Sequence, residues 1–124
     1  MWHDPNHEDA YFKYDKFLPG FTDNATATMK ANFVRLKKAV FCVGSGSAYD
    51  GGIEPYQSGV WGFTDATGAI VPMQAQRIYT DDTFGLRTLD ESGRLNLTIV
   101  PGARHSDWTG NEDVIKTWVL PHLS

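Results

Sequence analysis

Two short apolar runs, each followed at once by a loop of small residues or proline, constrain the fold of this chain more than any other feature. The first covers residues 38–43, is partly β-branched, and lacks the polar alternation of a strand with one solvated face. The second covers residues 95–100, between Gly93 and Pro101-Gly102. We predict two strands, the first covered on both faces as in a parallel sheet, and therefore an α/β fold.

Helical patterns surround these strands. A helix is predicted from Thr26 to Leu36, where apolar residues recur at i, i+4 and i+7. Another is predicted after Asn111, a suitable N-cap, and should end at Pro121. The remaining predictions are short pieces: loop with helical turns in 1–23, extended segments at 61–63 and 77–79, a turn at 65–68 and a helix at 82–89.

Composition narrows the classes of function. With 124 residues, of which 41% are hydrophobic and 21% charged, the chain suits one globular domain. A net charge of −4 with dispersed Lys and Arg argues against a nucleic-acid partner, and no apolar run is long enough for a membrane span. The first residues lack the pattern of a secretory signal, so an export signal is expected only upstream. A lone Cys42 excludes a disulfide framework and is interpreted as a buried, inert thiol.

The loops after the two strands each carry a residue suited to proton transfer. Asp50 follows the first strand and His105 follows the second. Serine hydrolases of the α/β type carry their triad in the order Ser, Asp, His, on loops that follow strands. The imidazole takes the proton of the nucleophile, and the carboxylate orients and stabilises the imidazole. Asp50 and His105 fill the last two places of this order, and we predict them as catalytic residues, although the eleven Asp and four His residues of the chain allow other such pairs.

Several segments, in order along nearly the whole chain, carry a family resemblance. They are Trp2-His3-Asp4-Pro5, Asp50-Gly51-Gly52-Ile53-Glu54-Pro55, Trp61-Gly62-Phe63, residues 79–89, Gly102-Ala103-Arg104-His105 and Leu120-Pro121-His122-Leu123. Together they resemble the palmitoyl-protein thioesterases, and more the second lysosomal type than the first.

The resemblance implies the C-terminal part of an α/β-hydrolase fold. Residues 1–36 would end the inserted lid, and residues 37–124 would hold the last strands and helices of the core. The substrate would be a fatty-acyl thioester, either palmitoyl-CoA or an S-acylated protein, with Trp2 and Ile53 lining the acyl groove. No metal or organic cofactor would be needed, and the location would be the lysosome or the secretory pathway.

The sequence departs from that family in its nucleophile. The family presents its serine in a Gly-x-Ser-x-Gly turn, and these 124 residues contain none. The segment Gly44-Ser45-Gly46-Ser47-Ala48 follows the Asp strand, so we interpret it as a flexible turn. We therefore expect this chain alone to be inactive, and to need the missing N-terminal half or self-association to cover its strand edges. A cysteine pair that brackets the catalytic His in some members is also absent.

Other interpretations stay open. Asn24 and Asn96 begin N-glycosylation sequons. His3 and His7 have a helical spacing that metal ligands use, but Pro5 between them favours a loop. The acidic residues Asp81, Asp82 and Asp107 are interpreted as solvated loop charges.

A different class of function is a non-catalytic lipid-binding or interaction module built on the same scaffold, because a fold alone does not define chemistry. The presence of both Asp50 and His105 favours the enzyme. The sequence leaves open the acyl carrier, the chain-length preference and the oligomeric state.

Overall fold

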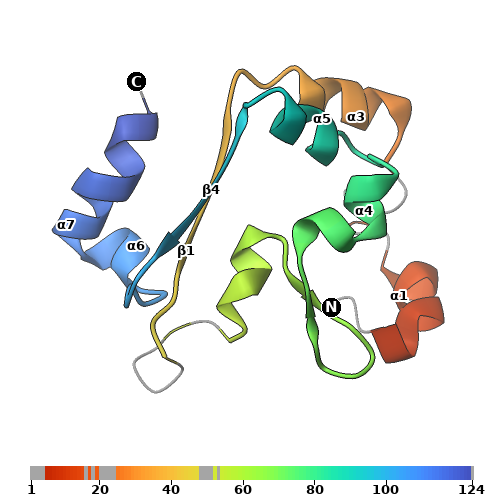
Figure 1. Cartoon of the computed structure of the whole chain (residues 1–124), viewed down its shortest axis with the longest axis horizontal. Helices are drawn as coiled ribbons and strands as arrows, with labels where there is room; N and C mark the ends of the chain where they lie inside the picture. Colours follow the sequence, from red (N-terminus) through yellow and green to blue (C-terminus); the bar gives the residue numbers. More distant parts are fainter. Residues whose placement is uncertain are drawn as a thin grey trace. The chain divides into compact units, whose positions relative to one another are not determined.

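The computed structural model describes residues 5–15, 17, 19, 25–47, 52 and 54–123 (Figure 1). The chain divides into two compact units, one formed by Met1–Ala39 with Gly62–Leu95 and the other by Val40–Trp61 with Asn96–Ser124. Each unit is therefore described by itself. The lid boundary expected after residue 36 stays a prediction.

The first unit is mainly helical. Its elements are η1 (Pro5–His7), α1 (Glu8–Tyr14), α3 (Ala27–Val34), β2 (Phe63–Thr64), β3 (Ile70–Val71), η4 (Met73–Ala75), α4 (Arg77–Thr80) and α5 (Leu86–Glu91). Helix α3 begins where the sequence predicts, because the Thr26 hydroxyl accepts a hydrogen bond from the Met29 N–H at 3.2 Å. It ends earlier than predicted, and the Arg94 guanidinium donates to the carbonyls of Val34 and Leu36 at 2.7 and 2.8 Å.

The second unit holds η3 (Tyr56–Val60), α6 (Asp107–Gly110), α7 (Glu112–Val114), the π-helical turn η5 (Ile115–Val119) and η6 (Leu120–His122). Asn111 is the predicted N-cap, since its side-chain oxygen accepts from the N–H groups of Asp113 and Val114 at 3.1 and 3.3 Å. The helical path continues past the predicted end, because Pro121 lies inside the 3-10 turn η6.

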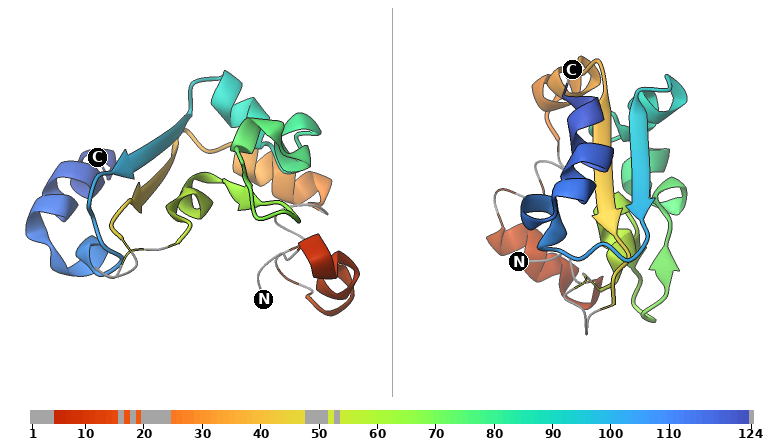
Figure 2. Two further views of the ribbon diagram at one scale, coloured as in Figure 1. Left: turned by 60° about the horizontal axis from the view of Figure 1, so that its bottom comes forward. Right: turned by 90° about the vertical axis from the view of Figure 1, so that its left-hand side faces the viewer.

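Strands β1 (Ala39–Gly44) and β4 (Leu95–Val100) pair with each other, and each runs from the first unit into the second. The Ala39 N–H donates to the Arg94 carbonyl at 2.8 Å, and the Ser45 N–H donates to the Val100 carbonyl at 3.1 Å. The same offset at both ends means that the strands are parallel, and their arrows point the same way in Figure 2. Both predicted strands and the mixed α/β class are confirmed. Every residue of β1 is buried or half-buried, whereas Ile99 in β4 is exposed.

One short element differs from the sequence prediction, and a predicted turn is confirmed. Residues 77–79 are not extended but lie in helix α4, whose Ile78 is buried. The predicted turn at 65–68 closes a small antiparallel hairpin, in which Phe63 pairs with Val71. The Asp65 carboxylate accepts from the N–H of Ala69, and Gly68 has a φ of +87°, which a residue without a Cβ adopts without strain.

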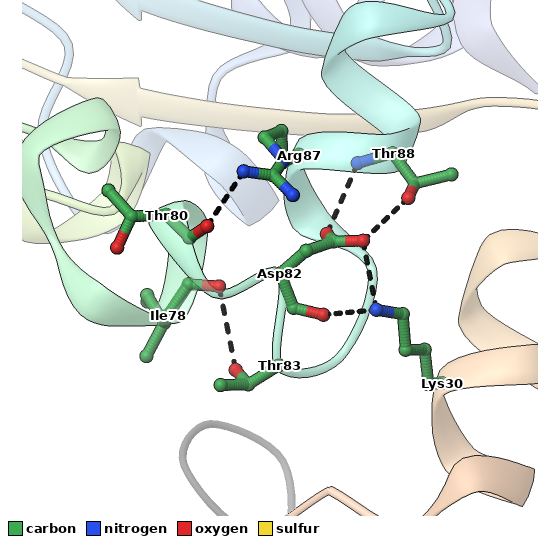
Figure 3. A network of polar contacts seen from close by, with 7 residues as sticks. All are labelled: Lys30, Ile78, Thr80, Asp82, Thr83, Arg87 and Thr88. Atoms are coloured by element: carbon green, nitrogen blue, oxygen red, sulfur yellow. Dashed lines mark hydrogen bonds and ion pairs between the residues drawn. The ribbon is translucent and has the colours of Figure 1, made fainter.

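The prediction that Asp82 is a solvated charge is wrong. Asp82 is only 5% exposed, and it adopts a left-handed backbone conformation with a φ of +50°. Its carboxylate accepts from the Thr88 N–H at 3.2 Å and the Thr88 hydroxyl at 2.6 Å, and forms an ion pair with Lys30 at 3.0 Å (Figure 3). The Lys30 ammonium also donates to the Asp82 carbonyl oxygen. Asp82 therefore joins α3 to the first turn of α5.

The contacts of Asp82 also set its pKa. Burial alone would raise the pKa, but the hydrogen bonds from Thr88 and Lys30, together with the positive charge of Lys30, hold the pKa of Asp82 below its ordinary value. A carboxylate whose pKa is lower in the folded state stabilises that state above the unfolded pKa of about 3.9. This contribution is lost as the pH falls through the lower, folded pKa.

We expect Asp82→Asn to lower the free energy of unfolding of the protein by about 2 kcal/mol at neutral pH, measured by urea unfolding. The substitution keeps the side-chain size and suits a positive φ, but leaves Lys30 without its partner charge. The expected cost stays below that of a fully buried pair because the Lys30 side chain is 38% exposed.

Asp81→Asn is the matched control, because Asp81 pairs with Arg77 at 3.2 Å while their side chains are 50% and 89% exposed. This control should change stability by roughly 0.5 kcal/mol or less. The difference between wild type and Asp82→Asn should persist through weakly acidic pH and shrink below about pH 4. Equal effects of the two substitutions, or a difference that grows on acidification, would contradict this account of Asp82.

Candidate active site

The carboxyl ends of β1 and β4 lie side by side, because the two strands are parallel and the N–H of Ser45, directly after β1, donates to the carbonyl of Val100, the last residue of β4. The loop after β1 begins at Ser45, and the loop after β4 begins at Pro101. Open α/β sheets place their ligands at this edge. The two loops that carry the predicted catalytic residues therefore start at one place.

These two loops also touch through their main chains. The Gly46 N–H donates to the Ala103 carbonyl at 3.0 Å, and the Gly102 N–H lies 3.4 Å from the Ser45 hydroxyl oxygen that accepts from it. Ala103 is only 5% exposed, so this contact is buried. The only sequence signal for it is the alternation of glycine and serine after β1, a pattern equally typical of a flexible turn.

His105 lies in a turn that its neighbours close. The Asp107 carboxylate accepts from the Arg104 N–H at 2.8 Å, and the Asp107 N–H donates to the Arg104 carbonyl at 3.1 Å. The Asp107 side chain is only 14% exposed, so its interpretation as a solvated charge is wrong. His105 itself is exposed.

Asp50, the predicted partner of His105, lies outside the described residues, as do Trp2, Ile53 and Asn24. The described residues nearest Asp50 on either side are Ser47 and Gly52, and the Gly52 N–H donates to the Ser47 carbonyl at 2.8 Å. The two flanks of the segment that carries Asp50 are thus hydrogen-bonded to each other. The first of them adjoins Gly46, which contacts the His105 loop.

Asn96, the second predicted glycosylation site, lies in β4 and is half-buried. The Thr98 hydroxyl donates to the Asn96 side-chain oxygen at 2.9 Å. The two polar residues of the sequon therefore lie on one side of the strand, and glycosylation at Asn96 stays a prediction.

Cys42 in β1 is half-buried rather than buried. Its sulfur lies 3.8 Å from the Trp118 carbonyl oxygen in η5. Burial raises the pKa of the Cys42 thiol, and a hydrogen bond with Thr98 offsets this only in part. A raised pKa disfavours the reactive thiolate, which supports the interpretation of an inert thiol.

Within the described residues, no group of three or more His, Cys, Asp or Glu side chains is placed to hold a metal ion. His7 is described and His3 is not, so the His3–His7 alternative lies outside the described residues in part. None of the helices described here is both long and apolar enough to cross a membrane.

Comparison with known proteins shows which family the chain belongs to. Residues 1–105 match the model of the family described as palmitoyl protein thioesterase. The chain is 36% identical to lysosomal thioesterase PPT2-B of Xenopus laevis and 37% identical to lysosomal thioesterase PPT2 of Bos taurus, in each case over 99% of this chain. It is 33% identical to palmitoyl-protein thioesterase 1 of Caenorhabditis elegans over 82% of this chain.

The chain spans 43% of the length of the Xenopus relative and 41% of the bovine one. The matched region includes both strands, the hairpin and the loop after β4 as far as His105. The resemblance drawn from the sequence motifs is confirmed, including its similarity to the second lysosomal type. This chain belongs to the palmitoyl protein thioesterase family.

Proposed function

We propose that these residues form the C-terminal part of a serine hydrolase that cleaves long-chain acyl thioesters, and that Asp50 and His105 are two members of its catalytic triad. The observation that carries the proposal is the pairing of β1 with β4, which starts the Asp50 and His105 loops at one sheet edge. Family membership supports the same chemistry. The nucleophilic serine lies in a part of the complete polypeptide outside this sequence.

The proposed reaction has two stages. The serine oxygen attacks the thioester carbonyl while His105 accepts the hydroxyl proton, and the proton then passes to the departing thiolate as the carbon–sulfur bond breaks. Water next attacks the acyl-serine ester while His105 accepts its proton, and the serine recovers a proton as the fatty acid leaves. Asp50 keeps the imidazole in the required tautomer throughout.

The names of the relatives suggest the substrate and the location. We propose a palmitoyl thioester, carried by coenzyme A or by a protein cysteine, as the substrate. The PPT2 relatives are named as lysosomal, and we propose a lysosomal or secretory location for this protein. The acyl groove would be lined in part by Trp2 and Ile53. Residues 1–36 would end the lid over this groove.

The experiment that tests this function is a thiol-release assay on the complete polypeptide with a palmitoyl thioester. We expect release of thiol and free fatty acid in equal amounts, and an acyl-enzyme that is trapped by rapid acid quench and detected by mass spectrometry. The rate should be unchanged by a metal chelator, since neither stage needs a metal. Binding of the thioester without turnover would favour the alternative, a non-catalytic lipid-binding module.

A further inference from the structure

We propose that Gly44 and Gly46 are positioning residues for catalysis, which set the place of the His105 loop through direct backbone contact with Ala103. This inference rests on the proposed function, because it concerns how the general base is held. Neither glycine touches the substrate in this account. Both act through the peptide that precedes Arg104 and His105.

The contact is unusually close because no side chain separates the two loops. A Cβ added at Gly46 would lie 2.8 Å from the Ala103 carbonyl oxygen and 3.1 Å from that of Gly102. A Cβ at Gly44 would overlap the same Ala103 oxygen outright. Real Cβ atoms essentially never approach that closely, so any substitution must move one backbone away from the other.

On the other side of the contact, hydrogen bonds hold both the N–H and the carbonyl of Ala103 in place. The Ala103 carbonyl accepts the Gly46 N–H at 3.0 Å, and the Ala103 N–H is 3.3 Å from the Val100 carbonyl in the turn after β4. Ala103 is also buried. A shift of this peptide is therefore passed to Arg104 and His105, which follow it directly in the closed turn.

Another glycine of the same unit, Gly59, gives a matched comparison. A Cβ at Gly59 would lie 2.7 Å from a methyl carbon of Val43 and 2.8 Å from its Cβ. This crowding is as severe as that at Gly46, and it also falls on β1. It involves a side chain of the strand, however, and neither Gly102 nor Ala103 is among the nearest atoms. Gly59→Ala therefore reports the cost of crowding β1 without displacing the His105 loop.

The test compares Gly46→Ala, Gly59→Ala and Gly110→Ala in the complete polypeptide with a palmitoyl thioester. Gly110 has nothing within 4 Å of an added Cβ, so its variant controls for the alanine substitution itself. We expect Gly46→Ala to lower kcat about 10- to 100-fold with little change in KM, as expected for a displaced catalytic group. Gly59→Ala should lower the unfolding temperature yet keep the wild-type kcat.

A spectroscopic measurement separates positioning from general loss of stability. At fixed pH, the ring carbon–proton NMR signal of His105 should move in Gly46→Ala and stay in place in Gly59→Ala. Hydrogen exchange at the residue-46 amide should be faster in Gly46→Ala, since its bond to Ala103 is disturbed.

The outcomes keep this inference distinct from the proposed function. If His105→Ala abolishes turnover while Gly46→Ala and Gly59→Ala behave alike, the triad stands and the positioning role is wrong. An unmoved His105 signal in Gly46→Ala would equally overturn the positioning role. If His105→Ala retains turnover, the proposed function itself fails.

Discussion

His105→Ala is expected to lower kcat for a palmitoyl thioester by about 10³-fold or more in the complete polypeptide. Without the imidazole, no group takes the proton from the serine hydroxyl, and none returns it to the leaving thiolate. KM should change little, because the ring acts on the reacting atoms rather than on the acyl chain. Steady-state thiol release measures the effect, at an enzyme concentration high enough to detect slow turnover while the substrate stays in excess.

His7→Ala is the matched control for this experiment. His7 is also an exposed histidine, but it precedes helix α1 in the first unit, whereas His105 follows β4 in the second. The control should retain the wild-type kcat. Wild-type turnover by His105→Ala would dispose of the triad assignment, whatever the control does.

Asp50→Asn is expected to lower kcat by roughly 10³-fold or more, with the fold intact. An amide at this position neither stabilises the imidazolium nor enforces the tautomer in which the ring nitrogen facing the serine accepts a proton. The measurement is kcat with the same palmitoyl thioester, alongside thermal unfolding to verify that stability is retained.

Two comparisons sharpen the Asp50 prediction. Asp107→Asn removes the carboxylate that closes the His105 turn by accepting from the Arg104 N–H, so it should reduce kcat far less than Asp50→Asn. A larger effect at Asp107 would make that residue the partner of His105.

The double variant Asp50→Asn with His105→Ala should be no slower than His105→Ala alone, since removing one of two groups that act as one unit already removes the effect of the other. Multiplied losses would show that the two residues act independently.

The parts of the fold that the sequence predicts well are those with strong local signals. The run 95–100 matches β4 residue for residue, and the run 38–43 matches β1 displaced by one residue. Local capping chemistry at Thr26 and Asn111 likewise marks the starts of α3 and α7. A sequence pattern of four to six residues with clear boundaries is enough to predict a strand or a helix start when the intrinsic propensity of its residues and their burial favour the same structure.

Short elements without such signals depend on contacts distant in sequence. Residues 77–79 have strand-like composition, yet they form α4 with Ile78 buried. The burial of Asp82 depends on Lys30, which lies 52 residues earlier, so no local pattern distinguishes it from the exposed Asp81. The Arg94 guanidinium likewise donates a hydrogen bond to the carbonyl of Val34, the last residue of α3, which lies 60 residues earlier.

Part of the candidate site can likewise be predicted from the sequence, and part cannot. The positions of Asp50 and His105 after successive strands can be predicted, because the order of strands and loops is a property of the sequence. The contact of Gly46 with Ala103 cannot be predicted, because it needs the register of β1 against β4. Register follows from pairing across the sheet, which local sequence specifies only weakly here.

A triad built from these two loops requires that the Asp50 carboxylate and the His105 imidazole share a hydrogen bond in the folded protein. A crystal structure of the complete polypeptide measures the separation between the nearer Asp50 oxygen and the facing ring nitrogen. We expect about 2.6–3.2 Å. Side chains that point to opposite sides of the sheet edge, too far apart for a direct or water-bridged contact, would contradict the account.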